Sequence, residues 1–275
     1  MLFTSAYQER GFVMAEPQIR FDDGAAYEQM MGAWSRIAGE VFLGWLAPDP
    51  GLRWVDVGCG NGAFTELIVD RCAPAGIAGI DPSEGQLTYA RQRHKAAVAE
   101  FSQGDAMALP YSDASFDAAV MALVIFFVPD PPRGVLEMLR VVRPGGLVAA
   151  YAWDMMGGGF PLEPVLAEMR AMDIATIRPP SSQVSRTEAL REVWTTAGLQ
   201  DVQTREIEVQ RSFVDFDEFW KFSTLGSTVA PTIAAMAPDV AASLKARVRA
   251  RLNGDRAGRF THQARANAVK GRVPV

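Results

Sequence analysis

The chain has 275 residues, which is enough to bury one large core. Hydrophobic residues make up 49% and charged residues 21%, so the composition excludes a wholly disordered chain and a fibrous repeat. The formal net charge of −5 disfavours a general nucleic-acid binder. The longest apolar run, Ala118–Pro129, is shorter than the roughly 20 residues that a membrane-spanning helix needs. We therefore expect a soluble protein with no nucleic-acid partner and no membrane span.

The N-terminus and the cysteines bear on location. Residues 1–10 lack the basic-then-apolar order of a secretory signal, and Cys59 and Cys72 make no disulfide framework. A cytoplasmic protein is the expectation. Met14 is followed by Ala-Glu-Pro and is an alternative start. We expect residues 1–24 to be an N-terminal extension, whose disorder stays an open alternative, and residues 25–275 to form a single domain.

Hydrophobic periodicity predicts strands that alternate with helices along the chain. Proline at 131 opens one helix, and Ser83 is placed to cap another. The predicted helices cover residues 26–46, 63–72, 83 to about 97, 131–142, 162–172 and 187–197. The predicted strands cover residues 53–57, 76–80, 98–102, 116–122, 146–153, 200–213 and 264–273.

This alternation predicts an α/β fold, a Rossmann-like, seven-stranded and mostly parallel sheet with helices on both faces. Residues 264–273 resemble a closing edge strand, so one reversed edge strand is expected. Ligands bind such sheets beyond the C-terminal ends of the strands. Two less regular segments, 155–186 and 214–256, are predicted to form an α-helical lid over that edge.

A glycine-rich loop is the strongest local signal. The segment Val55–Gly62 (VDVGCGNG) lies between a predicted strand and helix, where glycines let the backbone turn and approach a ligand. With Ala63, Gly58 and Gly60 also satisfy the pattern of a dinucleotide site. Asp81 closes the next strand and can accept from ribose hydroxyls. The loop and this acid alone leave a nicotinamide dinucleotide and S-adenosylmethionine both open.

Further segments follow in order: Gly79–Ser83 (GIDPS), Gly104–Pro110 (GDAMALP), Phe116–Ala118 (FDA), Val128–Pro131 (VPDP) and Leu139–Leu147 (LRVVRPGGL). Together with the glycine loop they resemble class I S-adenosylmethionine-dependent methyltransferases, in the group that includes ubiquinone and menaquinone biosynthesis methylases. The resemblance covers roughly residues 27–154. It implies an enzyme, a methyltransferase with S-adenosyl-L-methionine as cofactor and S-adenosyl-L-homocysteine as product, acting on a small-molecule acceptor.

The resemblance also implies roles for single residues. Gly58, Cys59 and Gly60 would lie under the methionine part of the cofactor, and Asp56 would help to hold its ammonium group. Asp81 would accept from the ribose. The remaining cofactor-binding candidates are Asp105 and the backbone of Ala106 at the adenine, Ala122 and Leu123 at the sulfonium, and Tyr27 and Trp34 closing over the cofactor.

Methyl transfer from a sulfonium needs mainly alignment in a dry pocket, so the sequence need not contain a strong base. The catalytic residue stays unknown; Asp154 is a weak candidate for a base, with a capping role as the competing interpretation. Where many relatives place a His pair, this chain has Phe126 and Phe127. Candidates for a substrate pocket are Phe126, Trp153, Phe160 and Trp220, each of which also fits an ordinary core. They favour an apolar or aromatic acceptor.

Other interpretations remain beside the enzyme. A non-catalytic protein that senses S-adenosylmethionine would share the glycine loop, Asp81 and Asp105, and a nicotinamide-dependent oxidoreductase is a third alternative. His94 and His262 form no metal-binding spacing, so no metal is expected. Basic residues outnumber acids from 245 to 272, a pattern typical of a solvated face, with an anionic substrate or partner as the alternative. The acceptor, the atom that is methylated and the oligomeric state stay open.

Overall fold

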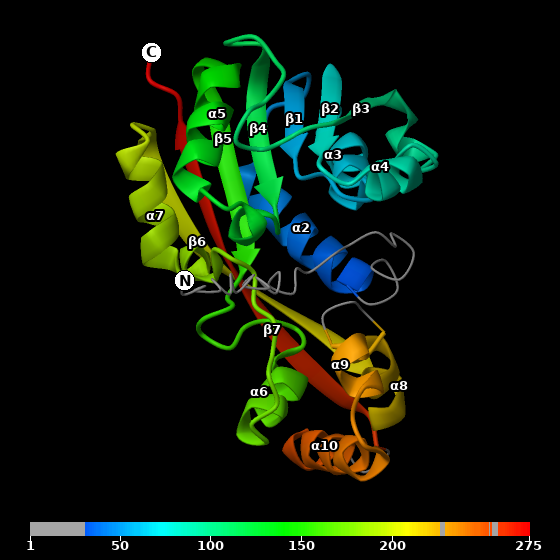
Figure 1. Ribbon diagram of the computed structural model, residues 1–275. Coiled ribbons are helices and arrows are strands. Elements are labelled where there is room, and N and C mark those ends of the chain that lie inside the picture. Colours follow the sequence, from blue (N-terminus) through cyan, green and yellow to red (C-terminus); the bar gives the residue numbers. More distant parts are fainter. Residues whose placement is uncertain (1–30, 226–228, 253, 255–257) are drawn as a thin grey trace, which may run out of the picture.

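A computed structural model describes residues 31–225, 229–252, 254 and 258–275 (Figure 1). Its centre is a seven-stranded sheet in the order β3-β2-β1-β4-β5-β7-β6. The strands are β1 (Arg53–Val57), β2 (Gly76–Asp81), β3 (Ala99–Gln103), β4 (Phe116–Ala122), β5 (Val142–Trp153), β6 (Gln200–Phe213) and β7 (Phe260–Arg272). The first five strands pair in parallel. The predicted fold class is confirmed.

The reversed strand is β7, which pairs antiparallel with both β5 and β6. It lies second from the edge, and β6 takes the edge itself, whereas the sequence had placed the reversed strand at the edge. The burial of the two strands explains this order. Residues 266–269 of β7 are buried, whereas β6 has many exposed residues along its length. The small and apolar side chains of β7 therefore occupy the covered position.

The helices surround the sheet. They are α2 (Ala33–Leu46), α3 (Ala63–Cys72), α4 (Glu84–Ala90), α5 (Pro131–Val141), α6 (Glu163–Ala171), α7 (Thr187–Thr196), α8 (Phe216–Ser223), α9 (Ala230–Ala234) and α10 (Pro238–Arg251). Helix α2 packs against α3, β6 and β7, while α5 packs against α7, β4 and β5. Figure 1 shows α5 in front of the strands and α2 behind them.

Local sequence explains where α4 begins, and tertiary contacts explain where it ends. The Ser83 hydroxyl accepts from the Gln86 amide at 3.3 Å, so it caps α4 as predicted. This helix ends at Ala90, earlier than the predicted 97. The Arg93 side chain donates to the carbonyl oxygen of Asn61 at 2.6 Å and to Glu66 at 2.8 Å. These bonds hold the chain in a turn toward α3, and a short 3-10 helix, Lys95–Val98, follows.

The segments predicted as lid form helices at one end of the molecule. Figure 1 shows α6, α8, α9 and α10 together at the far end of the long strands β6 and β7. Glu168 of α6 receives bonds from Arg247 at 2.8 Å and from Arg251 at 2.9 Å, both on α10. Lys245 pairs with Asp217 of α8 at 2.7 Å. The basic residues of α10 thus join helices to one another, and a lid function stays a prediction. Among the described residues, no helix combines the length and hydropathy needed to span a bilayer.

Candidate functional site

The glycine loop connects β1 to α3 beside the end of β2. The amides of Gly58 and Cys59 both donate to the carbonyl oxygen of Ile80, at 2.7 and 3.0 Å. Gly58 has a φ of +75°, and a Cβ at this position would lie 2.4 Å from the Val124 side chain. Only glycine fits both the backbone conformation and this close approach. The loop is thereby fixed against the C-terminal edge of the sheet.

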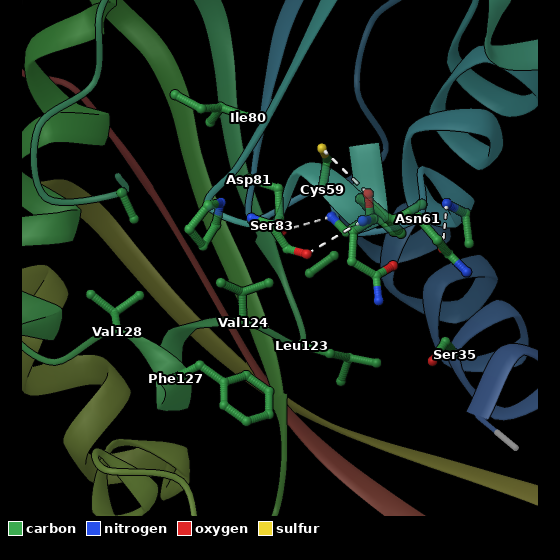
Figure 2. Close-up of a pocket in the computed structure, with 18 of the residues that line it drawn as sticks. Ser35, Cys59, Asn61, Ile80, Asp81, Ser83, Leu123, Val124, Phe127 and Val128 are labelled. Carbon is green, nitrogen blue, oxygen red and sulfur yellow. Dashed lines mark hydrogen bonds between the residues drawn. The ribbon is translucent and has the colours of Figure 1, made fainter. Parts of the chain in front are cut away.

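Asp81, the last residue of β2, lies under this loop (Figure 2). One carboxylate oxygen accepts from the Gly60 amide at 2.9 Å, and the other accepts from the Ser83 amide at 2.9 Å. Burial raises the pKa of this carboxyl, and the two backbone hydrogen bonds partly oppose the rise. Because each carboxylate oxygen has two lone pairs, Asp81 can accept two further hydrogen bonds.

A cavity of about 1160 Å³ opens at this edge of the sheet. It is lined by the loops that follow β1 to β4, by residues at the start of α2 and by a segment at 178–180. The predicted cofactor-binding residues that line it are Gly58, Cys59, Gly60, Asp81, Asp105, Ala106, Ala122 and Leu123. Residues far apart in the sequence thus meet around one space.

The loop after β3 forms one side of the cavity. Asp105 is exposed there, and its Oδ1 accepts from the Met107 amide at 2.8 Å. Ala106 and Met107 line the cavity beside it. A Cβ on Gly104 would lie 2.4 Å from Ile80, so this loop is held close to the end of β2. Asp105 is therefore close to Asp81 in the fold, and both carboxylates border the same space.

The segment after β4 forms an apolar wall. Leu123 has a φ of +62°, in the left-handed region, and its amide donates to the carbonyl oxygen of Tyr151 at 2.8 Å. Strained conformations of non-glycine residues persist where the surroundings fix them, and they concentrate at functional sites. Val124, Phe127 and Val128 continue the wall, and Figure 2 shows the Phe127 ring beside Leu123 and Val124.

The structure separates Asp56 from the cavity. Asp56 is fully buried in β1 and is not among the lining residues. Its Oδ2 accepts from the Thr65 hydroxyl at 2.6 Å, and its Oδ1 has no hydrogen-bond partner among the described residues. Burial raises the pKa of Asp56 to about 7 despite the bond from Thr65. Asp56 therefore does not border the cavity, and its help in holding a cofactor ammonium group stays a prediction.

Trp34 is also turned away. Its side chain is buried against Phe213 and His262, with ring centroids 6.5 and 5.7 Å apart. The cavity is lined instead by its neighbours Ser35 and Arg36. The helical rotation directs Trp34 to β6 and β7, so it does not line the cavity in this structure, and its closing over the cofactor stays a prediction. Tyr27 lies outside the described residues.

The carboxylate of Asp154 is bonded within the turn that follows β5. Its Oδ2 accepts from Arg265 at 2.6 and 3.1 Å, and its Oδ1 accepts from the Gly157 amide at 2.7 Å. It is buried and does not line the cavity. Both oxygens hold the turn after β5 against β7, which favours the capping interpretation. The role of Asp154 as a base stays a prediction.

None of the four residues predicted for a substrate pocket lines this cavity. Phe126 and Trp153 are buried in the core. Phe160 and Trp220 are half-buried and pack against that core. The ordinary core interpretation is favoured for all four. Phe127, next to Phe126, is the aromatic residue that reaches the cavity.

Sequence reasoning missed several lining residues. Ser35, Asn61, Gln86, Phe127, Tyr151 and Arg178 line the cavity. Asn61 was within the quoted glycine motif and could have been singled out. Arg178 comes from an irregular segment after α6, where the sequence carries no signal of the distant contact. Burial raises the pKa of Cys59, followed by the charges of Asp56 and Asp81, so a neutral thiol is expected. No cluster of metal-ligating side chains occurs in the described part of the chain.

Comparison with known proteins agrees with this geometry. Residues 55–150 match a family described as "Methyltransferase domain". The chain is 39% identical over 106 residues to a demethylmenaquinone methyltransferase of Desulfitobacterium hafniense, covering 37% of this chain and 42% of that protein. It is 33% identical over 128 residues to a malonyl-[acyl-carrier protein] O-methyltransferase of Serratia marcescens, covering 46% and 49%. The chain thus spans about half the length of these curated relatives.

Solved structures share the fold. The YcgJ protein from Bacillus subtilis superimposes with a TM-score of 0.58 at 15% identity, over 87% of this chain and 99% of that one. Phosphoethanolamine N-methyltransferase 2 of Haemonchus contortus, solved with S-adenosyl-L-methionine, gives 0.55 at 18% identity, over 91% and 56%. Residues 55–150 are thus similar to a methyltransferase domain, the relatives that match include demethylmenaquinone methyltransferases, and the fold is shared with solved methyltransferase structures.

Proposed function

We propose that this protein transfers a methyl group from S-adenosylmethionine to a small molecule bound in the same cavity. The observation that carries the proposal is the position of Asp81. Its carboxylate joins the glycine loop to the end of β2 and borders a cavity of about 1160 Å³. Pockets for one small ligand usually hold about 300–1,000 Å³. The larger volume supports a site for two ligands.

The glycine loop fits the cofactor. A Cβ on Gly60 would meet only one atom within 4 Å, the Gln86 Oε1 at 3.9 Å. The loop therefore leaves open space on its cavity side, where a ligand can approach the backbone. Asp81 keeps lone pairs for two ribose hydroxyls beyond its bonds to Gly60 and Ser83. We assign the methionine part of the cofactor to the loop and its ribose to Asp81.

The loop after β3 fits the base. Asp105 uses one oxygen to accept from the Met107 amide, and its other oxygen can accept from an exocyclic amino group. Ala106 and Met107 supply backbone and apolar surface next to it. These features support an adenine site at Asp105 and Ala106. The nicotinamide alternative has no comparable support, because the family match over residues 55–150 is to methyltransferases.

When bound, S-adenosylmethionine supplies a methyl carbon that is already activated, and the electrons of the broken carbon–sulfur bond stay on sulfur. The protein's contribution is alignment and exclusion of water. Leu123, Val124 and Phe127 provide an apolar wall that does both. Asp154 does not line the cavity, so the proposal gives it no part in the transfer.

The same wall supports an apolar or aromatic acceptor. Relatives of this chain are named for methylation of demethylmenaquinone and of a malonyl group on an acyl-carrier protein. These names, with the side chains of Leu123, Phe127 and Val128, favour phenols, quinols and acyl thioesters as the compounds to screen first.

The proposal is tested with S-adenosylmethionine labelled in its methyl group. The full chain is incubated with a panel of phenols, quinols and acyl thioesters, and small-molecule products are separated and counted. Label in at least one product is expected, at a rate that falls at least tenfold in Asp81→Asn. If the folded protein binds S-adenosylhomocysteine yet labels no member of the panel, the non-catalytic sensor is favoured instead.

A further inference from the structure

A short segment after α6 reaches the cavity from outside the sheet. Arg178, Pro179 and Pro180 line the cavity next to Phe127–Pro129. Its position is fixed by hydrogen bonds to the wall: the Ser181 amide donates to the Phe126 carbonyl at 3.0 Å, and the Ser181 hydroxyl donates to the Val128 carbonyl at 2.7 Å. The segment is therefore attached directly to the end of β4.

The backbone at Arg178 is also restricted by its own sequence. Proline fixes its own φ and confines the preceding residue to extended conformations, so Pro179 restricts Arg178 and Pro180 restricts Pro179. The Ser182 hydroxyl closes the turn by donating to the Pro179 carbonyl at 2.7 Å. The base of the Arg178 side chain is thus held in one place at the cavity.

Most charged side chains that line the cavity form ion pairs or hydrogen bonds with other residues of the protein. Glu66 pairs with Arg93 at 2.8 Å. Asp81 and Asp105 each accept from backbone amides and face the assigned cofactor site. The Nε of Arg36, near the start of α2, lies 3.6 Å from the Oε1 of Glu40.

Arg178 is the exception. It is exposed, and its guanidinium makes no hydrogen bond or ion pair within the described residues. An unpaired guanidinium presents a planar fork of donors that matches carboxylate and phosphate. The lining thus offers an uncompensated positive charge beside an apolar wall.

We infer that the methyl acceptor carries an oxyanion, a carboxylate or a phosphate, next to an apolar body, and that Arg178 binds this oxyanion. The inference rests on the proposed function. The apolar body packs on the wall of Leu123 and Phe127, and the charged end reaches the guanidinium of Arg178. Arg178 is then a specificity-determining residue that contacts the acceptor and leaves the cofactor site unchanged.

The test uses matched probes with the full chain saturated in S-adenosylhomocysteine. The pairs are 1-naphthoate with 1-naphthamide, and 1-naphthyl phosphate with 1-naphthol, titrated by calorimetry. In at least one pair, the anion should bind about tenfold more tightly than its neutral partner, as expected for a charged hydrogen bond at an exposed site. The pair that shows the preference tells carboxylate from phosphate. Arg178→Gln should remove the preference.

A matched control is Arg186→Gln. Arg186 is also exposed, lies at the start of α7 and does not line the cavity, so this variant should keep the preference. Equal binding within both pairs by the wild type, or a preference that survives Arg178→Gln, would overturn the inference. So would loss of S-adenosylhomocysteine affinity in Arg178→Gln, which would assign the guanidinium to the cofactor. Failure of the wild type to bind S-adenosylhomocysteine would instead remove the proposed function.

Discussion

Asp81 and Asp154 both lie at the C-terminal ends of strands, but their carboxylates differ in what they hold. Asp81 accepts from the glycine loop and borders the cavity. Asp154 is bonded to Arg265 and to the Gly157 amide, away from the cavity. The residue type and its place in the strand were the same in both cases. The partner, supplied by β7 for Asp154, decides the role.

Asp154→Asn should therefore lower stability and spare binding. The amide would lose the ion pair with Arg265, which bonds at 2.6 Å, and would turn a donor toward a guanidinium. A loss of about 2 kcal/mol in the free energy of unfolding is expected, measured by urea denaturation. The affinity for S-adenosylhomocysteine should stay within about twofold. Unchanged stability with reduced methyl transfer would instead restore the catalytic interpretation.

Asp56 predicts a pH dependence of stability. Burial raises its pKa to about 7 in the folded protein, against an ordinary value of 3.8. Between these values the folded state binds more protons than the unfolded chain, so its contribution is present at low pH and lost as the pH rises toward 7. Asp56→Asn, which cannot titrate, should lose about 2 kcal/mol less stability than the wild type between pH 5 and pH 8.

The measurement is urea unfolding of both proteins at the two pH values. Parallel changes in the wild type and in Asp56→Asn would show that Asp56 does not hold a proton in the folded state. Thr65→Val is a useful companion, because removing the hydroxyl that bonds Asp56 Oδ2 should raise the carboxyl pKa further.

Sequence patterns identified the loops of the site better than its side chains. Ala122 and Leu123 were assigned to the end of β4, and both line the cavity. For two predicted aromatic residues, the next residue in the chain lines the cavity instead. Phe127 lines it and Phe126 does not, and Ser35 lines it and Trp34 does not. Hydrophobicity cannot distinguish adjacent positions in the short 3-10 helix Ile125–Phe127 or at the start of α2. Tertiary packing sets the rotation, against β5 and α5 for the 3-10 helix and against β6 and β7 for α2. The cofactor roles themselves stay predictions.

Within the glycine loop, Gly58 and Gly60 meet different requirements, one for folding and one for space at the cavity. Gly58 is needed for folding, since φ is +75° and an added Cβ would lie 2.4 Å from Val124. Gly60 has a φ of +52° and an open space around its Cβ position. Gly58→Ala should cost at least about 2 kcal/mol of stability by strain and overpacking. Gly60→Ala should cost about 1 kcal/mol.

Gly60→Ala, the variant with the smaller loss of stability, should have the larger effect on cofactor binding. The Gly60→Ala methyl group would enter the space assigned to the cofactor, so affinity for S-adenosylhomocysteine should fall at least tenfold in a folded sample. Thermal unfolding and calorimetric titration of both variants measure the two effects. Wild-type affinity in Gly60→Ala would show that the ligand does not approach this part of the loop.

The ends of helices and strands were predicted closely where glycine, proline or polar residues flank the element. The strands Arg53–Val57, Phe116–Ala122 and Gln200–Phe213 and the helix Ala63–Cys72 begin and end at the predicted residues. Glycine, proline or polar residues flank these elements, and local chemistry decides their ends. Helix α4 was predicted too long, because the bonds of Arg93 to Asn61 and Glu66 are tertiary contacts with no local signal.

In the whole molecule, the long strands β6 and β7 extend beyond the rest of the sheet to the helices α6, α8, α9 and α10 (Figure 1). The sequence predicted helices in both lid segments, 155–186 and 214–256. Their helices α6 and α10 are joined through Glu168. From the segments predicted as lid, only 178–180 are among the described residues that line the cavity. The contact could not be foreseen, since it depends on hydrogen bonds of Ser181 to the wall after β4. The lid and the single domain stay predictions.

The proposed function requires the cavity at Asp81 to bind S-adenosylmethionine. Calorimetric titration of the purified full chain with S-adenosylhomocysteine tests it most directly, with a nicotinamide dinucleotide as the comparison ligand. One molecule of S-adenosylhomocysteine should bind with micromolar affinity, and the dinucleotide should not bind. Asp81→Asn should bind about 10- to 100-fold more weakly while unfolding near the wild-type temperature. Absence of binding in a folded wild-type sample, or equal affinity in Asp81→Asn, would contradict the account.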